Sequence, residues 1–354
     1  MASYGEVLEV LRDYRNTLEQ QAQAEMHAAF GGRGGGMTSF SARGGMSAFA
    51  TPLSNVHATG VGVRVRRGEV IPDEFVLKVY VFDKVSLDDT PALTRQFGPV
   101  DIDVEPLPIQ LALQGPGMAA HRQQHRPITG GLSIAPLNES HAGTLGCFLR
   151  RTIGGTEQVF ALSNNHVLAD TNRLPVGTCI VQPGPEVAPT QPGDAFAALS
   201  AFVPIQFPDS RLAPVVNRLD AAIAIIADLE LVRLGEMSGI GHYTPQLLAP
   251  VPGMRVIKSG RTTGVTTGTI TAARVNGVIV NYGTQTLPRL ATFNDTVEIV
   301  GGGDVPFSLP GDSGSVILER DSGRPVALLF AGDGVTSTAC DLGAVCQQFQ
   351  AFPV

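Results

Sequence analysis

The sequence of 354 residues lacks the features that mark secreted and membrane proteins. Its four cysteines form no C-x-x-C pair, which favours free thiols over a disulfide framework. No apolar run approaches the roughly 18 residues that a membrane-spanning helix needs. The first residues also lack the basic and apolar regions of an export signal. These absences predict a cytoplasmic protein.

Features that bind phosphate, nucleic acid or metal are also scarce. The net charge is −7, with no dense stripe of Lys and Arg, which disfavours nucleic-acid binding. The glycines at 31–36 are not followed by Lys-Ser/Thr, so a phosphate loop is not expected. His121 and His125 have the spacing of a helical metal pair, but they lie in a proline-rich segment without a third ligand. We therefore expect no metal, no cofactor, no nucleic acid and no membrane partner.

The composition favours a mainly β protein. Hydrophobic residues make up 43% of the chain, which is enough to form a core. The 41 glycines and 25 prolines indicate many turns rather than long helices.

The most informative segment is Gly311-Asp312-Ser313-Gly314-Ser315. A serine hydroxyl becomes a nucleophile when a base takes its proton and donors receive the developing oxyanion. Glycine at 311 permits backbone conformations in which neighbouring N–H groups converge. The segment predicts a catalytic Ser313 with an oxyanion hole formed by the amides of Gly311 and Ser313. The alternative interpretation is an ordinary Gly/Ser turn.

The general base is sought among seven histidines, none of which follows Ser313. This order excludes the α/β-hydrolase arrangement, in which the histidine comes last. An aspartate-first order is not excluded by position, but no aspartate has a matching context. His166 has the most suitable setting, because it follows an apolar strand-like stretch and two asparagines. Its structural alternative is a histidine that caps a turn.

Asp220 is the candidate for the third member of a triad. It precedes the apolar run Ala221–Ile226, where a carboxylate is costly to bury without a partner such as an imidazole N–H. The competing aspartates lie in Pro/Gly/polar surroundings; they are Asp170, Asp194 and Asp209. The alternative for Asp220 is a solvated residue at the end of a loop.

These motifs together resemble those of chymotrypsin/trypsin-like serine peptidases. The order His166, Asp220, Ser313 carries the resemblance, supported by the Gly-Arg-Thr-Thr-Gly motif within residues 258–268. The Ser-Asn-Asn-His-Val context is similar to a mostly bacterial, disulfide-free branch and, more distantly, to the plant narrow-leaf protein. Val167 stands where animal trypsins have cysteine.

The resemblance covers about residues 127–350 and implies two six-stranded antiparallel β-barrels with the site between them. It implies that the strand Leu328–Gly332 pairs with the substrate backbone, with Phe330, Ala331 and Gly332 lining the cleft. Phe307 would lie at the base of the pocket, which favours apolar or small substrate side chains. The Asp312 carboxylate needs a partner that the sequence does not identify.

The chain divides into five parts. Residues 1–30 form an amphipathic helix, and 31–53 form a Gly-rich flexible linker. Residues 54–126 form a small α/β accessory domain and a Pro-rich linker, with strands at 60–66, 74–82 and 100–104 and a short helix beginning at Ser86. The first barrel spans 127–245 with His166 and Asp220, and the second spans 246–354 with Ser313.

The sequence therefore predicts a serine endopeptidase acting on polypeptides. Two alternatives stay open: a latent or inactive peptidase fold that binds peptides or assembles, and an enzyme that cleaves only its own 31–46 linker. The helix at 3–29 either docks on a partner or another copy, or folds back on the body, since one apolar stripe fits both arrangements.

Overall fold

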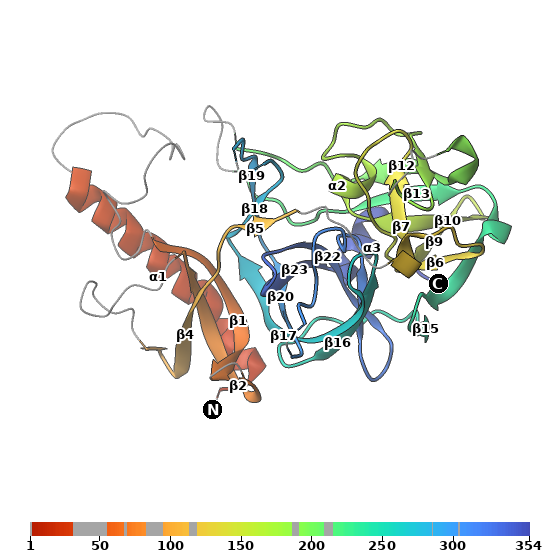
Figure 1. Cartoon of the computed structure of the whole chain (residues 1–354). Coiled ribbons are helices and arrows are strands. Elements are labelled where there is room, and N and C mark those ends of the chain that lie inside the picture. The colour runs from red at the N-terminus through yellow and green to blue at the C-terminus, as the bar shows by residue number, and fades with distance from the viewer. Residues whose placement is uncertain are drawn as a thin grey trace.

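The computed structural model describes residues 2–30, 55–66, 69–82, 95–112, 119–185, 191–208, 215–284, 286–303 and 305–354, and Figure 1 shows the whole chain. Strands form most of the regular structure, arranged in sheets of 13, 8 and 3 strands. Among the described residues, no helix is both long and apolar enough to cross a membrane.

The C-terminal half contains a closed six-stranded antiparallel barrel. Its strands pair in a ring, in the order β16 (Arg255–Gly260), β17 (Gly264–Asn276), β20 (Thr296–Gly301), β23 (Thr336–Asp341), β22 (Pro325–Gly332) and β21 (Val316–Glu319). Buried side chains fill the barrel, among them Val256, Ile270, Ile299, Phe307 and Val326. Ser313 lies in the turn that leads into β21.

The preceding sheet forms an open half-barrel. Its strand order is β24 (Phe352–Pro353), β9 (Phe148–Ile153), β10 (Thr156–Ser163), β13 (Ala222–Ile226), β12 (Ala195–Phe202), β11 (Cys179–Val181), β7 (Ser133–Pro136) and β8 (Gly143–Thr144). A small sheet joins β15 (Gly241–His242), β14 (Val232–Met237) and β6 (Ile128–Gly130). The expected mainly β, two-barrel architecture is confirmed, with the first barrel open and the second closed.

The N-terminal strands extend the sheet of the closed barrel. They are β1 (Val56–Arg66), β2 (Glu69–Val81), β3 (Gln96–Phe97) and β4 (Val100–Pro106), and β1 pairs with β17. Gly62 lies where β1 passes close to β17, since a Cβ there would stand 2.6 Å from the Thr271 carbonyl oxygen. The three strands expected at 60–66, 74–82 and 100–104 correspond to β1, β2 and β4.

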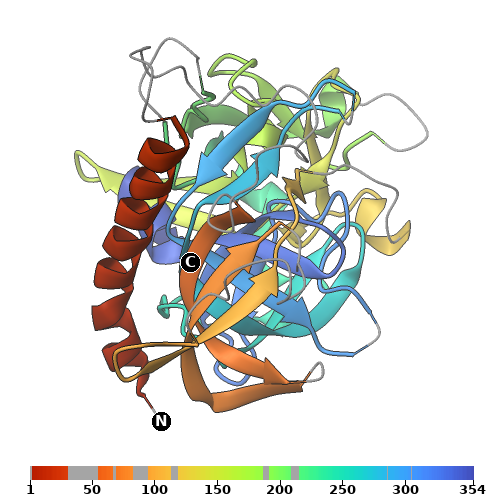
Figure 2. The same cartoon turned by 90° about the vertical axis from the view of Figure 1, so that its left-hand side faces the viewer.

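Helix α1 (Tyr4–Phe30) packs against these N-terminal strands, and Figure 2 shows it running alongside them. Its apolar face contacts β1, β2 and β4 through buried Val7, Leu11 and Tyr14. Arg15 fixes the helix further, because its guanidinium donates to Thr59 Oγ1 (2.8 Å) and to the Arg274 carbonyl (2.8 Å). For these residues the helix is folded back on the body.

Connecting elements complete the fold: β5 (Gln110–Leu111), β18 (Val278–Asn281), β19 (Leu290–Phe293), α2 (Asn165–Leu168), α3 (Leu342–Phe349) and 3-10 turns at Ala119–Arg122, Pro192–Asp194 and Leu229–Leu231. All four cysteines are free. The expected linker at 31–53 and the helix beginning at Ser86 lie outside the described residues.

Candidate active site

Two neighbouring strands bring His166 and Asp220 together. β10 and β13 pair up to Ser163 and Ala222, so the segments just beyond these residues lie side by side. His166 is in α2, directly after β10, and Asp220 lies just before β13. The His166 Nδ1–H donates to Asp220 Oδ2 at 2.6 Å, and the His166 backbone N–H donates to Oδ1 at 3.2 Å. Both contacts orient the imidazole with Nε2 as its free basic nitrogen.

Asp220 is completely buried and has further partners. The Tyr282 hydroxyl donates to Asp220 Oδ2 at 2.8 Å, and the Asn164 amide donates to the Asp220 carbonyl at 2.6 Å. Burial and the nearby Asp220 carboxylate raise the pKa of Tyr282, which keeps it a hydrogen-bond donor. A buried carboxylate with these donors fits the role of orienting a histidine rather than that of a solvated loop residue.

Ser313 reaches the same region from the closed barrel. Gly143 lies between α2 and the Ser313 turn, because a Cβ there would lie 2.5 Å from Val167 Cγ2 and 3.0 Å from the Ser313 carbonyl oxygen. Ser313 Oγ donates to the Phe330 carbonyl at 3.3 Å. Among the described residues no hydrogen bond joins Ser313 to His166, and the buried His166 Nε2 has no partner. Leaving a buried nitrogen without a hydrogen-bond partner costs about 1–3 kcal/mol of stability. Such unpaired atoms occur at sites that hold a base available for a reactant.

The turn at Ser313 is shaped by Gly311 and held by a neighbouring loop. Gly311 has φ +97°, a value that side-chain-bearing residues rarely adopt. The Pro310 carbonyl accepts from Thr262 Oγ1 at 2.6 Å, so it is held by a neighbouring loop. Within the described part of the chain, neither the Gly311 amide nor the Ser313 amide donates to a backbone or side-chain acceptor. Two unpaired N–H groups two residues apart are the donors that an oxyanion requires.

The partner of Asp312 is Lys258, together with the Thr262–Thr263 turn. Asp312 Oδ1 accepts from the backbone amides of Thr262 (2.8 Å) and Thr263 (3.1 Å). Its Oδ2 accepts from Thr263 Oγ1 (2.7 Å), Leu309 N (3.0 Å) and Lys258 Nζ (3.2 Å). Lys258 is also completely buried, and burial lowers its pKa while Asp312 opposes that change. This network fixes the turn from inside the closed barrel.

The expected substrate-binding residues divide between a cavity and the core. A cavity of about 20 Å³ beside Ser313 is lined by Leu111, Ser308, Leu309, Pro310, Leu329, Ala331, Gly332 and Gly334. Ala331 and Gly332, two of the predicted substrate-binding residues, are among those that line it. Phe307 lies in the barrel core, and its neighbour Ser308 lines the cavity in its place. Phe330 packs in the core and presents its carbonyl to Ser313.

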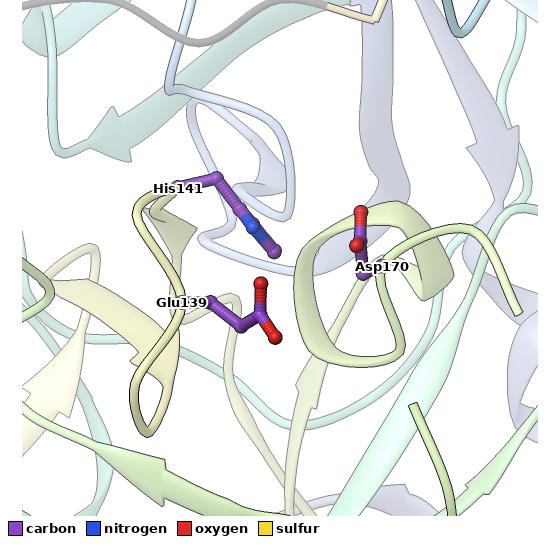
Figure 3. A group of neighbouring side chains, drawn as sticks. All are labelled: Glu139, His141 and Asp170. Atoms are coloured by element: carbon purple, nitrogen blue, oxygen red, sulfur yellow. The ribbon is translucent and has the colours of Figure 1, made fainter. Parts of the chain in front are cut away.

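One side-chain group has the composition of a metal site. Glu139, His141 and Asp170 offer ligand atoms that all lie within 4.8 Å of one another, and Figure 3 shows their arrangement. Arg173 already supplies a cation, since its guanidinium pairs with Glu139 (2.6 Å) and with Asp170. His141 Nε2 bonds the Val167 carbonyl at 3.1 Å. The arrangement therefore ties two loops together beside α2. The rings of His121 and His125 each bond a backbone carbonyl.

Sequence reasoning missed three groups that shape the site. Lys258 begins the segment 258–268 that holds the Gly-Arg-Thr-Thr-Gly motif, and its position after two apolar residues is a signal of burial. Tyr282 has no local signal, because its contact with Asp220 spans 62 positions of sequence. Leu111 lines the cavity beside Ser313, but it lies in a proline-rich segment whose sequence is typical of a linker.

Comparison with known proteins supports the resemblance seen in the motifs. A family model described as the Nal1 C-terminal domain matches residues 197–341. Over 320 residues the chain is 25% identical to Protein NARROW LEAF 1 of Oryza sativa subsp. japonica, covering 77% of this chain and 50% of that protein. The chain thus spans about half the length of this curated relative.

Solved structures similar in arrangement are bacterial serine proteases. Thermobifida fusca Protease A has 18% identity and a TM-score of 0.44, and the match covers 64% of this chain and 98% of that chain. Cellulomonas bogoriensis chymotrypsin has 16% identity and a TM-score of 0.42, with the same two coverages. The chain resembles chymotrypsin-like serine proteases, and its two-barrel fold rests on the strand pairing described above.

Proposed function

We propose that this protein is a serine endopeptidase that cleaves polypeptides through His166, Asp220 and Ser313. The observation that carries the proposal is the buried His166–Asp220 pair, whose free Nε2 lies in the same interbarrel region as Ser313. A protein that only bound peptides would have no need of an oriented base beside a serine with unpaired turn amides.

The chemistry is acyl transfer. His166 Nε2 takes the Ser313 proton as Oγ attacks a peptide carbonyl, and the Gly311 and Ser313 amides receive the oxyanion. The imidazolium then protonates the leaving amine, and Asp220 stabilises its charge. Water repeats the cycle on the acyl-enzyme and restores Ser313. For attack, the Ser313 hydroxyl gives up its hydrogen bond to the Phe330 carbonyl and donates to His166 Nε2 instead.

The lining of the cavity beside Ser313 supports an apolar or small substrate side chain. No residue in that lining carries a charge. A buried Arg or Lys of a substrate would find no carboxylate to offset its desolvation there. The four free cysteines favour a reducing compartment, so we place the activity in the cytoplasm.

A fluorogenic peptide library tests this proposal. The wild type should cleave after apolar or small residues, and Ser313→Ala should remove cleavage throughout the library. A clear preference for Arg or Lys would contradict the apolar pocket. Cleavage that persists in Ser313→Ala would contradict the assignment of the nucleophile.

The latent or peptide-binding alternative keeps one supporting observation. Ser313 and His166 are only 7% and 5% exposed, although a peptide would have to reach both. A site whose three side chains are present but covered favours regulation over loss of function.

A further inference from the structure

Strand β5 lies where a peptide would be expected to bind. Leu111 pairs antiparallel with Gly332 at the end of β22, and Gln110 pairs parallel with Val280 of β18. β5 therefore fills the place between β22 and β18. β21 pairs with β22 only as far as Leu328, so the end of β22 would otherwise expose backbone N–H and C=O groups that can pair with another chain.

Side-chain and backbone contacts hold β5 in this place. Gln110 is completely buried, and its amide donates to Asp333 Oδ2 at 2.9 Å and to the Pro108 carbonyl at 3.1 Å. The Ala112 amide donates to the Asn281 carbonyl at 3.2 Å. A buried glutamine whose amide N–H groups bond to an aspartate is a specific anchor, although its Oε1 has no partner among the described residues.

The position of β5 matches that of a substrate strand. An extended peptide adds to a sheet edge through main-chain hydrogen bonds, and pockets then select its side chains. Leu111 pairs with Gly332 and also lines the cavity that Ser313 lines. Its side chain forms part of the apolar wall of that cavity. Ser313 is 7% exposed with Leu111 in this position.

We propose that residues 110–112 occupy the substrate-binding edge of β22 and inhibit the site in cis, so that peptides gain access only when β5 leaves. This inference rests on the proposed function of the same site. It also names the preferred substrate class: extended peptides that carry an apolar residue opposite Gly332.

The expected size of the effect follows from effective concentration. A tethered segment competes at an effective concentration of the order of 1 mM. If the free segment bound with a Kd of about 0.1 mM, the tethered one would weaken peptide binding about ten-fold. Inhibition of this size is measurable and reversible.

The experiment compares the full chain with the double variant Gln110→Ala/Leu111→Gly. Ile109→Ser is the matched control, because Ile109 is adjacent in sequence but 39% exposed. Two substrates are used: an extended fluorogenic peptide, which pairs with Gly332, and a single-residue ester, which does not reach it. The double variant should raise kcat/KM about ten-fold for the peptide and change it little for the ester. The control should behave as the wild type.

The outcomes separate this inference from the proposed function. Ester hydrolysis with equal peptide hydrolysis in all three proteins would overturn the inference alone. If no protein hydrolyses either substrate, the proposed function fails, and a binding measurement then decides the inference. For that measurement, a labelled peptide Pro-Ile-Gln-Leu-Ala is titrated into Ser313→Ala proteins with and without the β5 substitutions. Tighter binding to the substituted protein supports occupation of the edge by β5, and equal binding overturns it.

Discussion

The buried pair of Lys258 and Asp312 should decide whether the turn at Ser313 keeps its catalytic shape. In Lys258→Met the apolar stem of the side chain is largely replaced, but the ammonium that stands 3.2 Å from Asp312 Oδ2 is removed. Both side chains are completely inaccessible to solvent, so water does not replace the lost cation. Removing one partner of a buried ion pair typically costs about 3–5 kcal/mol.

Two opposing effects set where in that range the cost falls. Burial is the largest influence on Lys258 and lowers its pKa, so the ammonium itself is costly to bury. Asp312 also keeps four other donors, from Thr262, Thr263 and Leu309. We therefore expect the lower end of the range, about 3 kcal/mol, which is a large share of a total stability of about 5–15 kcal/mol.

Urea unfolding of wild type, Lys258→Met, Asp312→Asn and the double variant measures this cost. Arg255→Met on the same strand is the control, because its ion pair with Asp321 is exposed and should be worth less than about 1 kcal/mol. The double variant should lose less than the sum of the two single losses, since neither charge is then left unpaired. A misplaced oxyanion donor should also lower kcat about 100-fold. A Lys258→Met protein as stable and as active as Arg255→Met would refute the reasoning.

Three further predictions concern other parts of the molecule. Burial raises the pKa of Glu298 to about 7 from 4.5, so its contribution to stability is complete below pH 4.5 and is lost as the pH rises through 7. The stability of Glu298→Gln relative to wild type, measured by urea unfolding, should therefore rise by up to about 3 kcal/mol between pH 4 and pH 8. A stability difference that does not change with pH would contradict this. Tyr282→Phe removes a hydrogen bond to Asp220 and should lower kcat about ten-fold with little change in KM, whereas unchanged kinetics would show that Asp220 does not need this donor. Leu11→Ala should lower the free energy of unfolding by about 2–4 kcal/mol, because Leu11 is only 3% exposed where it packs against β1 and β2. A loss as small as that of Leu8→Ala, at an exposed position of the same helix, would show that α1 is not docked in solution.

The sequence predicted those parts of the fold whose signals are local. Strand alternation at 60–66 and 100–104 identified β1 and β4, and the spacing of Val7, Leu11 and Tyr14 identified α1. The pairing of β1 with β17 could not be predicted, because it joins residues more than 200 positions apart and the sequence of neither strand indicates which strand it pairs with. For the same reason, periodicity alone left both arrangements of α1 open.

At the candidate site, chain order and local context predicted a triad of His166, Asp220 and Ser313. The structure joins His166 to Asp220 and brings the Ser313 turn close to α2 at Gly143. Phe307 shows the limit of carrying a position over by resemblance: alternation along the segment turns Phe307 into the core and Ser308 toward the cavity. β5 was unpredictable for a physical reason. Its two residues lie between prolines and have no periodicity, and they become a strand only because β22 and β18 offer unpaired edges.

The most direct test of the central claim is labelling of the purified chain with a fluorophosphonate serine probe. The wild type and the Gln110→Ala/Leu111→Gly variant are compared with Ser313→Ala and His166→Ala. Labelling of the wild type should map to Ser313 and should be absent from Ser313→Ala. It should fall by orders of magnitude in His166→Ala, because the serine then loses its base. No labelling of either the wild type or the β5 variant, or labelling that survives in Ser313→Ala, would contradict the central claim.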